Sequence, residues 1–63
     1  MNDTQKRALQ YVKNTNGGAT KAIFIEDHDP IGRMLWTDLD GMIREDDNGR
    51  IWLTEAGEAA LAA

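Results

Sequence analysis

The spacing of apolar residues predicts helices in the first two thirds of the chain. Ala8, Leu9 and Val12 recur on one helical face, with Tyr11 at its edge, so a first helix is expected over Thr4–Thr15. Asn16-Gly17-Gly18 would end it.

A second helix is expected to follow Thr20, whose side chain suits an N-cap position, over Lys21–Asp27. Ala22, Ile23 and Phe24 would face inward. The β-branched and aromatic run at 23–25 would also suit a strand, although we prefer the helical interpretation.

The dipeptide Asp29-Pro30 favours a third helix. Aspartate caps helices, and proline at the first helical position loses no hydrogen bond. The helix is therefore predicted over Pro30–Asp40, with Ile31, Leu35 and Leu39 on its buried face.

The pattern then changes to the alternation of strands. Met42–Glu45 and Arg50–Leu53 are predicted to pair around Asn48-Gly49, the preferred sequence of a two-residue turn in which both residues have positive φ. Thr54 has the character of a helix N-cap, and a closing helix is expected to run from there to Ala62.

Length and composition restrict the class of protein. Sixty-three residues suit one domain, 1–63, with a small core. The absence of cysteine excludes disulfides and thiolate zinc sites. No apolar run could span a membrane, and Met1–Thr4 lack the features of a secretion signal, so we expect a cytoplasmic protein with no membrane partner.

The net charge of −4 is unevenly distributed along the chain. Residues 1–25 carry four basic side chains and one acidic side chain, whereas residues 26–63 carry ten carboxylates and three arginines. A protein that binds duplex DNA through phosphates usually has a basic face. Here the basic excess lies in the first third of the chain.

The order of three helices, a two-stranded wing and a last helix resembles winged helix-turn-helix domains of bacterial and phage regulators. The most specific part of the resemblance is Gly49…Leu53-Thr54…Gly57…Leu61, and the whole covers Thr4–Leu61. It implies a mostly α fold with a small β-hairpin. It specifies the fold better than any one family.

In DNA-binding members of that fold, the third helix enters the major groove and the wing contacts the backbone or minor groove. The resemblance implies that Arg33 reads guanine and that Thr37 contacts a base or phosphate. It also implies phosphate contacts by Arg50, Arg44 and Lys21. The implied function is transcriptional regulation through duplex DNA, with a homodimer supplying additional phosphate contacts.

The carboxylates support a second interpretation, an acidic protein-interaction module that binds a basic protein in the manner of a DNA-mimic inhibitor or antirepressor. Exposed tryptophans are typical of partner interfaces, although both rings could instead cover the edge of the core. The candidate partner-binding residues are Trp36, Trp52, Asp38, Asp40, Asp46 and Asp47.

The sequence does not favour an enzyme, a cofactor or a metal site. It has neither cysteine nor serine, and its one histidine, His28, is expected to be solvated in an acidic turn. Asp46, Asn48, Gly49, Ile51 and Glu55 resemble the later positions of a calcium-binding loop, but the first ligand position would be Arg44. Arginine cannot bind calcium, so a hairpin turn is the simpler interpretation.

Overall fold

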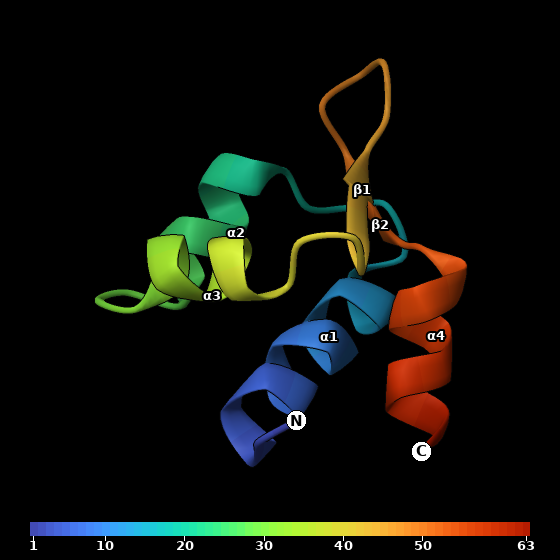
Figure 1. Ribbon diagram of the computed structural model, residues 1–63. Coiled ribbons are helices and arrows are strands. Elements are labelled where there is room, and N and C mark those ends of the chain that lie inside the picture. Colours follow the sequence, from blue (N-terminus) through green and yellow to red (C-terminus); the bar gives the residue numbers. More distant parts are fainter.

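A computed structural model describes all residues, 1–63, as four helices and one antiparallel hairpin. The expected order of elements is confirmed, and residues 23–25 are helical (Figure 1). The elements are α1 (Asp3–Thr15), α2 (Lys21–Asp27), α3 (Gly32–Asp38), β1 (Ile43–Glu45), β2 (Ile51–Leu53) and α4 (Glu55–Ala62).

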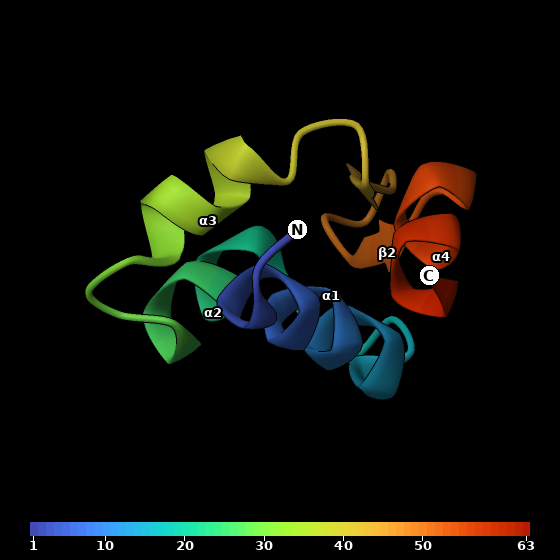
Figure 2. The ribbon, with the colours of Figure 1, turned by 60° about the horizontal axis from the view of Figure 1, so that its bottom comes forward.

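Helix α1 lies between two regions of the molecule. The pair α2 and α3 packs on one side of it, and the hairpin with α4 packs on the other (Figure 2). The three helices α1, α2 and α3, strand β2 and the residues Ala19 and Leu39 beside these helices contribute to one core of buried apolar residues: Ala8, Leu9, Val12, Ala19, Phe24, Leu35, Leu39 and Ile51. None of the four helices has the length and apolar character that crossing a membrane requires.

Helix α2 buries a different face from the one expected. Phe24 is fully buried, but Ala22 and Ile23 are exposed, Ile23 to 42%. The ring of Phe24 packs edge-on against Tyr11 of α1, with ring centroids 5.9 Å apart. Because side chains two positions away on a helix point in a very different direction, burying Phe24 in this way turns Ala22 to solvent.

Helix α3 begins later than Asp29-Pro30 suggested. The Asp29–Pro30 peptide bond is cis, and the helix starts at Gly32 after Ile31, which makes no side-chain cap. Gly32 packs against the Ile25 carbonyl oxygen, where a Cβ would collide with it. The predicted buried stripe is nevertheless correct, since Leu35 and Leu39 are buried and Ile31 is partly buried.

The hairpin turn differs from the predicted two-residue type. Asp46 N–H donates to the Arg50 carbonyl at 2.8 Å, so the loop contains Asp47, Asn48 and Gly49. Of these three residues only Gly49 has positive φ, 77°, as in a three-residue loop that ends in a left-handed residue. An Asp46 carboxylate oxygen accepts from the Asn48 and Arg50 N–H groups, both at 2.9 Å, and stabilises this turn.

The hairpin also pairs with the segment that precedes α2. Ile51 N–H donates to the Ala19 carbonyl at 3.0 Å, and Thr20 forms an isolated antiparallel bridge with Arg50. The start of α2 and the start of β2 are therefore held side by side.

Thr54 caps α4 as predicted, because its hydroxyl accepts from Gly57 N–H at 3.2 Å.

Candidate functional site

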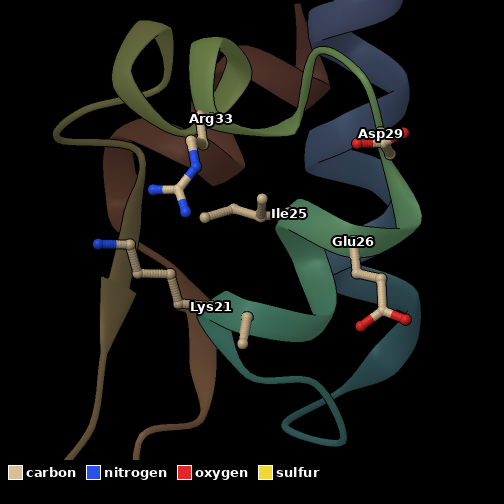
Figure 3. A pocket seen from close by; sticks show the side chains of 6 residues that line it. Lys21, Ile25, Glu26, Asp29 and Arg33 are labelled. Atoms are coloured by element: carbon tan, nitrogen blue, oxygen red, sulfur yellow. The ribbon is translucent and has the colours of Figure 1, made fainter.

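The larger of two surface pockets is a groove of about 350 Å³ between α2 and α3 (Figure 3). The two helices approach closely there because Gly32 has no side chain to separate it from Ile25. The groove is lined by Lys21, Ala22, Ile25, Glu26, Asp29 and Arg33.

The charges in this groove are separated. Lys21 and Arg33 lie at one end of the groove, on the same side of Ile25, whereas Glu26 and Asp29 lie at the other end (Figure 3). Neither cation forms an ion pair, since the single ion pair of the protein joins Lys13 to Glu58. The groove thus has one end where two positive charges lack a carboxylate partner.

At the cationic end of the groove, Lys21 lies over an aromatic ring that packs against the core. The Lys21 ammonium lies 5.2 Å from the centre of the Trp36 ring, within the range of a cation–π interaction. Trp36 packs edge-on against buried Phe24, with centroids 5.7 Å apart. Trp36 is partly buried and covers the edge of the core, which is the second of the two interpretations considered for it.

Thr37 lies one turn beyond Arg33 on α3. Its hydroxyl donates to the Arg33 carbonyl at 3.1 Å, so its oxygen lone pairs remain available to a donor. Asp38 and Asp40 are exposed near the end of the same helix. The α3 surface therefore changes from basic to acidic along its length.

In the hairpin, Asp46 has a structural role. Besides the two turn N–H groups, its carboxylate accepts from Trp52 Nε1 at 2.9 Å. The Trp52 hydrogen bond, followed by the backbone donors, lowers the pKa of Asp46 below its ordinary value of 3.8. Asp47 is exposed beside it.

Trp52 and Arg44 lie on the same face of the hairpin. They are paired across the strands, and the Arg44 guanidinium lies 5.8 Å from the centre of the Trp52 ring. The ring also packs on Gly17, where a Cβ would collide with it. Both residues line the second pocket, of about 290 Å³, between the hairpin, α1 and α4.

The structure thus divides the five residues predicted to contact DNA. Lys21 and Arg33 share the α2–α3 groove, with Thr37 next to it on α3. Arg44 stacks on Trp52, and Arg50 Nη1 donates to the Gly18 carbonyl at 3.2 Å. The two hairpin arginines contribute to the structure around the hairpin as well as to its surface charge.

The sequence interpretation missed four groove residues and misplaced His28. Ala22, Ile25, Glu26 and Asp29 were not candidates, although their spacing of i, i+3, i+4 and i+7 marks one helical face and could have revealed them. His28 is partly buried rather than solvated, and its Nδ1 lies 2.7 Å from the Phe24 carbonyl oxygen.

His28 belongs to an aromatic cluster between α1 and α2. Its ring packs on Phe24 and Tyr11, with centroids 4.4 Å and 4.9 Å away. The Tyr11 hydroxyl donates to an Asp27 carboxylate oxygen at 2.6 Å. Burial, together with this bond to Asp27, raises the pKa of Tyr11 to about 12.

No group of three histidine, aspartate or glutamate side chains is arranged to hold a metal ion. Comparison with protein-family models, with curated proteins and with solved structures finds no match for this chain.

Proposed function

We propose that this protein is a small winged-helix DNA-binding protein that acts as a transcriptional regulator. The observation that carries the proposal is the pair of unpartnered cations, Lys21 and Arg33, on the α2–α3 surface. Duplex DNA attracts such cations to its phosphates, and α3 presents Arg33 and Thr37 on consecutive turns.

The arrangement around the hairpin supports the winged-helix part of this proposal. A wing requires a hairpin attached firmly to the helices, and the pairing of Thr20 with Arg50 attaches β2 beside the start of α2. The element order of the resemblance is also the order of the helices and strands in the chain.

The carboxylates weaken DNA binding but do so unequally. The Asp46 carboxylate accepts three hydrogen bonds from donors of the same chain. Asp38, Asp40 and Asp47 are exposed and form no ion pair. Each of these three would repel nearby phosphates. One copy therefore offers few favourable phosphate contacts, and we propose that a homodimer binds the duplex.

An amide NMR titration with a short duplex at low salt tests the proposal. We expect shifts in α2 and α3, around Lys21, Arg33 and Thr37, that disappear as salt is raised. The α1 residue Arg7, an exposed cation outside the groove, serves as the internal comparison. No shifts, or shifts confined to α1, would overturn the proposal.

A second candidate function is the acidic protein-interaction module. It is favoured by the exposed carboxylates of Asp38, on α3, and Asp40, just beyond it, together with Met34 of α3, which is 56% exposed. Asp38→Lys separates the two functions: it should strengthen DNA binding by removing a repulsive charge, but abolish capture of a basic protein partner.

A further inference from the structure

The direction of the Arg33 side chain is informative about what it can contact. From α3 it extends across the groove toward Ile25 and Lys21 of α2 (Figure 3). Reading guanine requires the arginine fork to extend from the protein into the major groove and meet two base acceptors. A side chain directed along the protein surface, beside a second cation, is better placed for the DNA backbone.

Lys21 is positioned for the same contact. Its ammonium lies 5.2 Å from the centre of the Trp36 ring, and Trp36 is held in turn by the fully buried Phe24. This packing limits the freedom of a long side chain, so less entropy is lost when the ammonium binds an anion.

The two cations at this end of the groove have no carboxylate partner and repel each other, and an anion between them would relieve that repulsion. A phosphate suits the pair because its oxygens accept the arginine fork and the lysine ammonium at the same time. A neutral base edge would satisfy Arg33 but leave Lys21 unpaired.

The acidic end of the groove restricts how many phosphates can bind. Glu26 and Asp29 line the same groove beyond Ile25, and neither is paired with a cation. They would repel a neighbouring phosphate of the same strand. Only the cationic end of the groove therefore favours a phosphate.

From these observations we infer that Lys21 and Arg33 together hold one backbone phosphate of duplex DNA, so that this contact is independent of base sequence. The inference rests on the proposed function and states which part of the DNA the groove binds. Sequence selectivity, in this view, comes from other exposed positions of α3, such as Thr37.

The test compares Lys21→Ala, Arg33→Ala, their double variant and Arg33→Lys on two duplexes of equal length, one rich in G·C and one in A·T. Each alanine variant should weaken binding of both duplexes equally, about tenfold at moderate salt, and lower the salt slope by about one. Because both cations hold the same phosphate, the double variant should lose less than the product of the single losses.

Arg33→Lys should retain most of the binding, because an ammonium binds a phosphate as a point charge, whereas the planar guanidinium fork fits the two acceptors of guanine better. Arg7→Ala is the matched control, with the same loss of charge outside the groove and little effect expected. Glu26→Gln should tighten binding by removing the repulsion. Thermal unfolding of each variant establishes that it is folded.

Three outcomes would overturn the inference. If Arg33→Lys loses as much as Arg33→Ala, and loses most on the G·C-rich duplex, Arg33 reads a base, and the proposed function survives without the inference. If inorganic phosphate shifts the Lys21 and Arg33 amides at the same phosphate concentration as the duplex, the groove binds free phosphate. If the unmodified protein binds neither duplex, the proposed function itself fails.

Discussion

The two regions on either side of α1 use similar polar residues in different ways. In the hairpin, Asp46 accepts from Trp52 and from two turn N–H groups, and Arg44 stacks on Trp52. On the α2–α3 surface, Lys21 and Arg33 have no carboxylate partner. In a tight turn a carboxylate lies within reach of nearby donors, whereas neighbouring helices can leave like charges facing one groove.

The largest expected effect on stability comes from Gly32→Ala, which disrupts the packing of α2 against α3. A Cβ at position 32 would collide with the Ile25 backbone carbonyl, which cannot rotate away as a side chain could. We expect the free energy of unfolding to fall by about 3 kcal/mol, measured by urea denaturation, and the groove to be lost.

Gly41→Ala is the control for this substitution. Gly41 has φ of 83°, but a Cβ there would meet nothing within 4 Å. We expect only backbone strain, about 1 kcal/mol. Equal losses at positions 32 and 41 would show that close helix contact is not what positions the α2–α3 groove.

The second prediction concerns the hairpin at acid pH. The pKa of Asp46 is lower in the folded protein than its ordinary value of 3.8. Its stabilising contribution is therefore complete above that value and is lost as the pH falls below it, through the folded pKa. Thermal unfolding between about pH 5 and pH 2, followed by tryptophan fluorescence, should show this loss.

Asp46→Asn should reduce stability at neutral pH, because the amide keeps one acceptor oxygen for the turn N–H groups but presents an NH2 donor to the Trp52 Nε1–H. It should also flatten the acid dependence. Asp47→Asn is the matched control, since Asp47 is exposed beside it and the pKa shift belongs to Asp46. Identical acid profiles for Asp46→Asn and the unmodified protein would mean that this carboxylate does not hold the hairpin.

The third prediction concerns the contact of Tyr11 on α1 with Asp27 on α2 at alkaline pH. The pKa of Tyr11 rises from 10.0 to about 12 on folding. The stability linked to its protonated hydroxyl is present below pH 10.0 and is lost as the pH rises through about 12. Because the chain has one tyrosine, ultraviolet absorbance measures its titration directly.

Tyr11→Phe should remove this alkaline loss and lower stability at neutral pH by about 1 kcal/mol, through the missing hydrogen bond to Asp27. A tyrosine absorbance titration centred near pH 10 in the folded protein would contradict the prediction. The hairpin, and therefore the acid dependence, should remain unchanged in this variant.

The smallest effect is expected from Lys13→Ala, which removes the single ion pair. Lys13 and Glu58 lie 3.3 Å apart, but their side chains are 52% and 54% exposed. Water screens such a pair, so we expect a loss of about 0.5 kcal/mol or less in urea denaturation. A larger loss would show that α4 depends on this charge pair rather than on its apolar packing.

The fold was more predictable from the sequence than the candidate site. The stripe Ala8, Leu9 and Val12 and the Thr54 cap identified α1 and the start of α4, because both signals depend on residues only a few positions apart. The same local reasoning failed at Asp29-Pro30 and at Asn48-Gly49. At the turn, the Asp46 side chain stabilised a conformation that residue preferences alone did not indicate.

Lys21 and Arg33 were both candidates from the sequence, but nothing in it placed them in one groove. Their place in one groove depends on the close contact of Gly32 with Ile25, a relation between two helices. Likewise, Asp46 and Trp52 were candidates for a partner surface, and only the hairpin geometry revealed their hydrogen bond to each other.

The sequence by itself determined the order of the elements, most of the core and the uneven distribution of charge, because periodicity, capping and composition are local or additive properties. Tertiary structure decided which charges remain free. That outcome depends on which side chains from distant positions meet, and a charge is available to a ligand only where no partner of the same chain has reached it.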